Sequence, residues 1–130
     1  MIIMSENIVF MAESTICPIV MMITALVIWK FPAEFRGFFA YHTVLAEKTP
    51  QTWTAAQSYF GKIGFFSNLA ALVLTLIAFV PVIVAERLQS YGALVCMTAT
   101  AVQVAVVLID IFIVEGLLKK HFDKDGNPRQ

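Results

Sequence analysis

The sequence predicts an all-α membrane protein with three transmembrane helices and a short interfacial cytoplasmic helix. Three long apolar stretches support this prediction, at residues 8–29, 63–85 and 94–114, each 21 to 23 residues long. About 20 helical residues cross the ~30 Å hydrocarbon layer of a bilayer. Because hydrocarbon offers the backbone no water, each stretch must close its own hydrogen bonds as a helix. The composition agrees, since 59% of the residues are apolar and only 14% are charged.

Residues 1–130 are predicted to form a single three-span membrane domain, with a cytoplasmic loop at 30–62 and a cytoplasmic tail at 115–130. With three crossings, the loop and the tail share one side of the membrane. They hold eight of the nine Lys and Arg residues, all except Arg87. Since basic residues stay cytoplasmic, we expect a multi-pass protein with its N-terminus outside and its C-terminus in the cytoplasm.

The first span carries three weakly or strongly polar residues on one helix face, since Glu13, Cys17 and Thr24 are spaced by four and seven. Glu13 lies roughly 24 Å from Trp29 at helical rise, close to the outer interface. Its carboxylate either reaches up to water or is presented to something approaching from outside. Cys17 and Cys96 fall at different depths, so we interpret both as small apolar side chains rather than as a disulfide.

The loop between the first two spans begins with five aromatic residues within 31–41, which is typical of an interfacial belt. Thr49 and Pro50 then have the residue types of a helix N-cap and first helical position. We expect a short helix that lies at the interface and runs into the second span near Gly61. Its helical spacing rests on Trp53, Gln57 and Phe60.

The second span has a stripe of small and weakly polar residues at three-four spacing. Such a face lets neighbouring membrane helices approach closely, so we interpret it as the packing seam against the other two spans. Near the end of this span, Pro81 is expected to kink the helix. The stripe consists of Gly61, Gly64, Asn68, Ala71, Thr75 and Ala78.

The third span contains two polar residues of interest, Gln103 and Asp110. Gln103 lies near mid-membrane and should face protein, because an amide that faces lipid would be unsatisfied. Asp110 lies about one turn inside the cytoplasmic end. An intramembrane acid costs at least ~2.5 kcal/mol at the helix centre and marks a functional site by default. The alternative is a solvated or helix-bonded acid near the interface. Glu13 and Asp110 lie at opposite depths and cannot form one acid–base pair.

Two segments of the chain carry motifs of a known family. The first contains Phe39-Ala40-Tyr41-His42-Thr43, then Trp53, Ala56-Gln57 and Gly61-Lys62. The second contains Glu115 and Leu118 to Asn127. Together they resemble the C-terminal three-helix unit of the SdpI-like family of bacterial membrane proteins. Members of the family carry a Gly-aromatic-Arg-Thr motif, a tryptophan, an Ala-Gln or Ala-Asn pair, a glycine, and a lysine-rich tail that ends in Phe-Asp-x-x-Gly-Asn. The resemblance covers about residues 35–127.

The resemblance implies a non-enzymatic protein of the bacterial inner membrane that confers immunity to a secreted, sporulation-delaying peptide toxin. In one member it also implies signalling, through a transcriptional repressor held at the membrane. This chain has Ala40 where the family usually has glycine, and His42 where it has arginine, so the positive charge there depends on pH. The motif positions carried over are Tyr41, His42, Thr43, Trp53, Gln57 and Gly61.

A second function class remains open, a structural accessory subunit of a larger membrane complex such as a respiratory one. The expected partners are the lipid bilayer, other membrane subunits or a second copy, and a peptide toxin. The sequence has no nucleophile–base pair, phosphate loop or ligand cluster, so we predict no catalytic, cofactor-binding or metal-binding residues. Asp123-x-Asp125-Gly126 lacks the third ligand and the distal Glu of a calcium loop. Nucleic-acid binding is not expected, because the basic residues flank the membrane.

Overall fold

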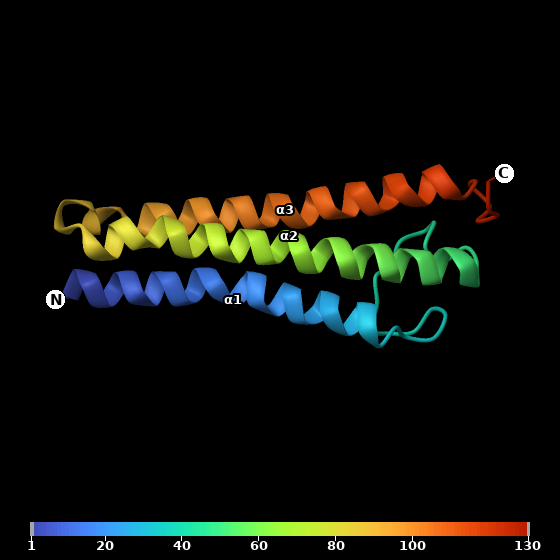
Figure 1. The fold of residues 1–130 in the computed structure, drawn as a ribbon, viewed down its shortest axis with the longest axis horizontal. Coiled ribbons are helices and arrows are strands. Elements are labelled where there is room, and N and C mark those ends of the chain that lie inside the picture. Colours follow the sequence, from blue (N-terminus) through green and yellow to red (C-terminus); the bar gives the residue numbers. More distant parts are fainter. Residues whose placement is uncertain (1, 130) are drawn as a thin grey trace.

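The computed structural model describes residues 2–129, with side chains from Ser5 onward. It contains the helices α1 (Ile2–Lys30), α2 (Pro50–Val84) and α3 (Gly92–His121), and a 3₁₀ helix η1 (Glu86–Tyr91) between α2 and α3. The three long helices pack against one another along the long axis of the molecule (Figure 1). Successive helices run in opposite directions, so both connections lie at the ends of the bundle.

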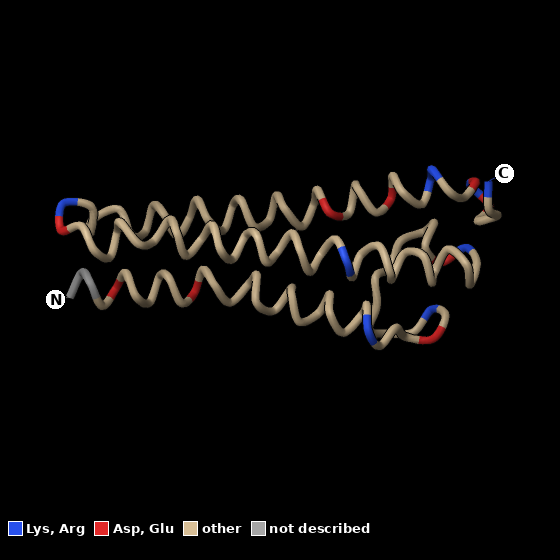
Figure 2. The backbone as a smooth tube through the Cα atoms, viewed as in Figure 1, with Lys and Arg blue, Asp and Glu red and all other residues tan. Residues whose placement is uncertain are grey.

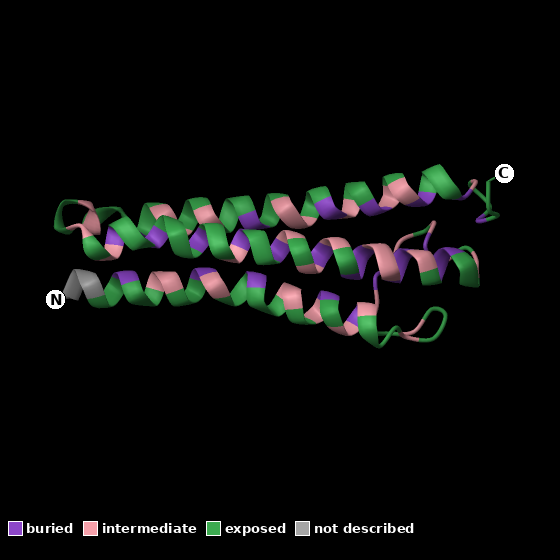
Figure 3. Cartoon of the chain, viewed as in Figure 1, coloured by how far each residue is buried: buried purple, intermediate pink, exposed green. Residues whose placement is uncertain are grey.

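Three helical segments are long and apolar enough to cross a membrane: Ser5–Lys30, Pro50–Val84 and Glu86–His121. The predicted all-helical chain with three spans is therefore confirmed. Only 22%, 28% and 22% of their apolar windows are buried inside the bundle, and the remainder faces outward (Figure 3). Exposing such a surface to lipid carries no hydrophobic cost. Exposing it to water would cost about 25 cal/mol per Å² of apolar area.

The buried face of α1 repeats at helical spacing. Its buried residues are separated by seven, four, seven and three positions, which keeps them on one side of a 3.6-residue helix. α1 also bends near its middle (Figure 1), and it contains a proline, which removes one backbone hydrogen bond and commonly bends a helix. The buried residues are Asn7, Ser14, Pro18, Ala25 and Ile28.

Helix α2 differs from the prediction at its start, because the expected separate interfacial helix is absent from the described part of the chain. Thr49 is confirmed as the N-cap and Pro50 as an opening helical residue, and α2 then continues without interruption to Val84. Gly61 does not end the helix. A glycine inside a helix costs only about 1 kcal/mol, and no cap or proline accompanies this one.

The small-residue stripe of α2 meets both neighbouring helices, with its two glycines against α1 and Ala71, Thr75 and Ala78 on the side of α3. A Cβ atom added to Gly61 would lie 2.4 Å from Trp29 Cβ, and one added to Gly64 would lie 3.2 Å from Ala25 Cβ. The two backbones therefore meet more closely than side chains of ordinary size would permit. Of the remaining stripe residues, three are buried and Ala78 is exposed. The buried three are Asn68, Ala71 and Thr75.

Helix α2 ends one turn after Pro81. The backbone N–H of Ala85 donates to the Pro81 carbonyl at 2.8 Å, and η1 then begins at Glu86. This turn lies near the start of α1, where the Asn7 amide donates to the carbonyl of Gln89 at 2.8 Å. One side chain of α1 thus satisfies a carbonyl of the α2–α3 connection.

The charged residues gather at the two ends of the bundle, and Lys and Arg favour one of them (Figure 2). We call this end the basic end and define it by the segment 31–49, the first turns of α2 and residues 115–129. Arg87 belongs to η1, which connects α2 and α3 at the opposite end of the bundle. A buried apolar cluster at the basic end joins all three helices with the 31–49 segment and the tail. It contains Ile28, Tyr41, Ala46, Ala56, Phe60, Val114, Leu118 and Phe122.

Candidate functional site

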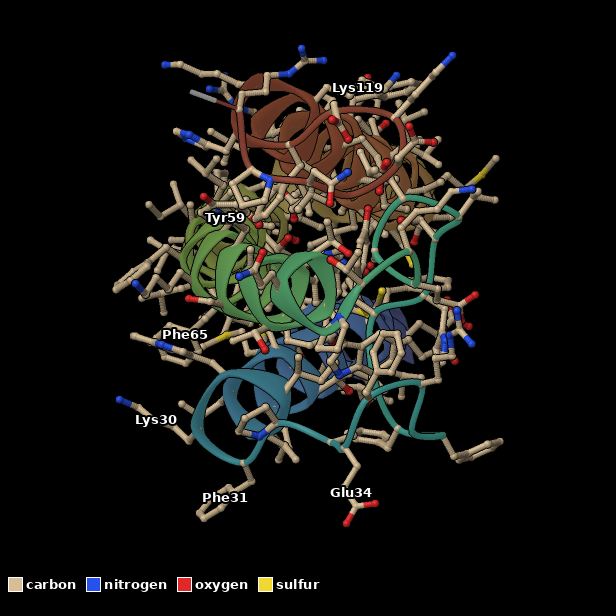
Figure 4. The ribbon with its side chains drawn as sticks, turned by 90° about the vertical axis from the view of Figure 1, so that its right-hand side faces the viewer. Lys30, Phe31, Glu34, Tyr59, Phe65 and Lys119 are labelled. Carbon is tan, nitrogen blue, oxygen red and sulfur yellow. The ribbon has the colours of Figure 1, made fainter. Side chains whose placement is uncertain are left out.

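Segments far apart in the sequence meet at the basic end, which Figure 4 views end-on. The first contact is between the 31–49 segment and α2. The side chain of Gln57, only 1% exposed, donates to the Tyr41 carbonyl at 2.8 Å and accepts from the Tyr41 N–H at 2.7 Å. The Tyr41 ring also stacks on Phe60, with centroids 4.9 Å apart. The side-chain amide of Gln57 therefore satisfies both backbone groups of Tyr41, as a neighbouring strand would.

Tyr41 also connects this loop to α3. Its hydroxyl donates to Glu115 Oε1 at 2.8 Å. Burial raises the pKa of the Tyr41 hydroxyl well above its ordinary value, and the hydrogen bond to Glu115 adds to the shift. The hydroxyl therefore stays protonated and keeps donating at any physiological pH.

The start of α2 is closed by a reciprocal capping box. The Thr49 hydroxyl accepts from the N–H of Thr52 at 3.1 Å, and the Thr52 hydroxyl accepts from the N–H of Thr49 at 3.0 Å. Both donors would otherwise lack helical partners. The Thr49 hydroxyl also donates to the Gly126 carbonyl at 3.1 Å, so the same side chain bonds the C-terminal tail to the start of α2.

The tail itself is an ordered turn after α3. Asp123 Oδ1 accepts from the backbone N–H groups of Asp125 and Asn127, each at 2.9 Å. Arg129 Nε donates to the Lys119 and Phe122 carbonyls at 2.8 and 3.0 Å, which occupies carbonyls at the end of the helix. The Asp123 carboxylate thus stabilises the turn by accepting two of its backbone N–H groups.

Gly126 is required by this turn, because its φ of +85° lies in the left-handed region. A Cβ atom there would also lie 2.8 Å from Lys48 Cβ and 2.8 Å from Thr49 Cγ2. We expect G126A to detach the tail from α2, at a cost of roughly 1–2 kcal/mol from the backbone alone. Hydrogen exchange of the Asn127 amide should accelerate.

The control for this prediction is N127A, since the Asn127 side chain makes no hydrogen bond within the described residues and the substitution keeps both of its backbone bonds. Equal exchange at residue 127 in G126A and N127A would contradict the assigned role of Gly126.

His42 lies in the 31–49 segment and contacts two acceptor groups. Its Nδ1 lies 2.6 Å from Glu47 Oε1 and its Nε2 lies 3.2 Å from the Phe38 carbonyl. Both partners are acceptors, so only the imidazolium form donates to both. The hydrogen bond to Glu47 raises the pKa of His42 above its ordinary value, and the Phe38 carbonyl adds to this shift. The contacts of His42 thus favour its positively charged form.

This geometry predicts a pH dependence. Because the folded pKa of His42 is raised, the contact contributes fully below the ordinary histidine value of about 6.5 and fades as pH rises through the raised value. The ring protons of His42, assigned with H42Q, should titrate above 6.5 by proton NMR. E47Q should lower that midpoint. A midpoint that E47Q leaves unchanged would contradict the assignment.

Trp53 fixes the other side of this loop. Its indole N–H donates to the Ala33 carbonyl at 3.1 Å, and the His42 ring lies against it at a centroid distance of 5.1 Å. Phe35 meets the same indole edge-on. The remaining motif residue, Thr43, accepts from the Ala46 N–H at 3.2 Å and starts the turn that precedes α2. Four of the six motif positions thus take part in contacts between the 31–49 segment and the helices, namely Tyr41, His42, Trp53 and Gln57. Thr43 stabilises a turn within the segment, and Gly61 sets the α1–α2 distance.

The intramembrane polar residues lie at different depths between the two ends of the bundle and make separate contacts. Gln103 is buried, and its amide donates to the Ser14 carbonyl at 2.8 Å and lies 3.0 Å from the Thr75 hydroxyl. Asp110 accepts from the Ser67 hydroxyl at 2.5 Å. Glu13 is exposed on α1 and belongs to neither contact.

Sequence reasoning missed Asn7, Ser14 and Ser67. The spacing of seven between Asn7 and Ser14, on the same face as Pro18 and Ala25, was the available signal for two of them. Within the described residues no group of three or more His, Cys, Asp or Glu side chains is placed to hold a metal ion.

Comparisons with family models, with curated proteins and with solved structures found no match to this chain.

Proposed function

We propose that this chain is a non-enzymatic, SdpI-like membrane protein that gives its cell immunity to a secreted peptide toxin. One observation supports this most. The residues that carry the resemblance come from two distant segments, and hydrogen bonds join them through Tyr41, which bonds to Gln57 and to Glu115. Gly126 of the second segment also accepts from the Thr49 hydroxyl, which lies between the motifs of the first. Hydrogen bonds between motif residues are expected if the motif marks a structural unit of the family. An accidental resemblance would give no reason for them.

A groove of about 420 Å³ between α2 and α3 is where we place peptide binding. It is lined by small and apolar side chains, including Ala78 and Ala99, and by Gln103. Gln103 Oε1 is buried and accepts no hydrogen bond from the residues that the structure describes. A buried acceptor without a donor costs about 1–3 kcal/mol. A peptide would reach this oxygen only by parting α2 from α3, and a donor placed there would recover that cost.

Survival of bacteria exposed to the purified sporulation-delaying peptide toxin tests this proposal. Cells that express the chain should survive doses that kill cells carrying an empty vector. A78L/A99L fills the groove and should remove protection. A70L/A101L is the matched control, because these alanines also lie on α2 and α3 but do not line the groove. Failure of the unaltered chain to protect would overturn the proposal.

The same unpartnered Gln103 oxygen favours a second candidate, an accessory subunit of a larger membrane complex, with a neighbouring transmembrane helix as donor. Purification in mild detergent separates the two. A stoichiometric set of redox partners would exclude immunity, whereas a lone monomer or homodimer would exclude the subunit role.

For orientation, we propose the N-terminus outside and the basic end in the cytoplasm of a bacterial inner membrane, because basic residues are retained there. In a chain without Cys17 and Cys96, an impermeant thiol reagent should label S90C from outside and should not label V44C. Both positions are exposed, so the reverse pattern would invert the topology.

A further inference from the structure

A cleft of about 640 Å³ opens at the basic end between the 43–48 segment and the end of α3 with its tail. Its volume lies within the ~300–1,000 Å³ range of small-molecule sites. Four cationic side chains line it, together with two acids and a few apolar residues. The cations are Lys48, Lys119, Lys124 and Arg129.

The acids of the cleft are already occupied by the fold. Glu115 accepts from the Tyr41 hydroxyl, and Asp123 accepts from two backbone N–H groups of the tail. Among the described residues the one ion pair within 4.0 Å is His42 with Glu47, which lies outside this lining. Within the described residues, the three lysines of the cleft therefore have no carboxylate partner, and these residues give the cleft an excess of positive charge.

The other lysines lie elsewhere on the surface. Figure 4 shows Lys119 and Lys30 at opposite edges of the end face, on α3 and α1. Lys30 lies over the Trp29 ring, with Nζ 4.2 Å from its centroid. Lys62 and Lys120 are exposed and do not line the cleft. Of the six lysines, Lys48, Lys119 and Lys124 thus gather in the cleft, and the other three lie outside it.

The depth of the cleft matches the headgroup layer of a membrane. Glu115 directly follows the apolar stretch 94–114, and Lys119 lies about 6 Å further along the helix axis. Val44, which is 77% exposed, and Leu45 line the same cleft. A ligand there would meet cationic and apolar side chains together.

We propose that this cleft binds the headgroup of an anionic phospholipid. Its phosphate would face the three lysines, and the first carbons of its acyl chains would contact Val44 and Leu45. Clefts of basic residues at the cytoplasmic ends of transmembrane helices recognise anionic lipids by this combination of charges. Inorganic phosphate offers the same charge without the apolar contacts, so it should bind more weakly. The proposal does not depend on toxin immunity.

Native mass spectrometry of the purified full chain in mild detergent tests this assignment. With phosphatidylglycerol we expect one retained lipid per chain, and with phosphatidylcholine markedly less. K48Q/K119Q/K124Q should weaken the retention of phosphatidylglycerol by about fivefold for each lysine, which is the usual surface contribution of one such cation. K30Q/K62Q/K120Q removes the same charge from outside the cleft and should retain the lipid as the unaltered chain does.

Single substitutions keep the test decisive if the triple variant folds poorly. Lys119 and Lys120 are adjacent on α3, yet only Lys119 lines the cleft, so K119Q should weaken retention and K120Q should not. Equal losses in the two variants, or in the two triple variants, would show attraction to the general surface charge and overturn the proposal. Displacement of the lipid by an equal concentration of inorganic phosphate would also overturn it.

Discussion

We expect G61A to push α1 away from α2 and to lower the free energy of unfolding by about 1–3 kcal/mol, as in overpacked cores. The added Cβ would lie 2.4 Å from Trp29 Cβ, 2.8 Å from Trp29 Cα and 3.0 Å from the Ala25 carbonyl oxygen. Two of these atoms belong to the backbone of α1, so rotation of a side chain cannot relieve the contact. Thermal unfolding in detergent, followed by circular dichroism, would measure the loss.

The control is the same substitution at Gly116, also within a helix. A Cβ there meets no heavy atom within 4 Å. Because alanine favours helix over glycine by up to about 1 kcal/mol, G116A should leave the protein unchanged or make it slightly more stable. The two variants therefore differ in the sign of their effect. A G61A protein as stable as G116A would show that the two helices do not meet at this glycine.

The sequence predicted the spans because a membrane imposes a local requirement. Each crossing must be apolar over about 20 residues and must satisfy its own backbone, and both properties can be read from a continuous stretch. The Thr49–Pro50 start of α2 was predicted for a similar reason, since a cap depends on residues a few positions apart.

The end of the expected interfacial helix was wrong because no local signal decides it. Gly61 was taken as the junction between two helices, yet α2 runs through it to Val84. The glycine serves the contact with Trp29, which lies on another helix 32 positions away in the sequence. A small residue that permits close packing and one that ends a helix look the same in a single sequence.

The hydrogen bonds of the basic end could not be predicted from spacing. Tyr41 and Glu115 are separated by 74 residues, and Thr49 and Gly126 by 77. In a helical bundle, the rotation and the depth of each helix decide which polar groups meet. Residue spacing shows only which face of its own helix a polar group occupies. The resemblance pointed to most of these residues, whereas the bonds that join them required the fold.

Q57L is expected to loosen the 31–49 segment while leaving the three helices formed. Leucine has a volume close to that of glutamine but can neither donate nor accept. The N–H and the carbonyl of Tyr41 would both lose their partner in a buried place, at about 1–3 kcal/mol for each group. Hydrogen exchange at the Tyr41 amide should accelerate, and the melting temperature in detergent should fall.

Q51L provides the comparison, since Gln51 lies on the first turns of the same helix and is exposed. It should change neither the exchange at Tyr41 nor the melting temperature, and equal behaviour of Q51L and Q57L would contradict the role of the buried amide. Q57L also distinguishes the contribution of the groove to protection from that of the basic end. Protection against toxin that survives Q57L but is lost in A78L/A99L would depend on the groove alone, whereas protection lost in both would require the basic end to be held on the bundle.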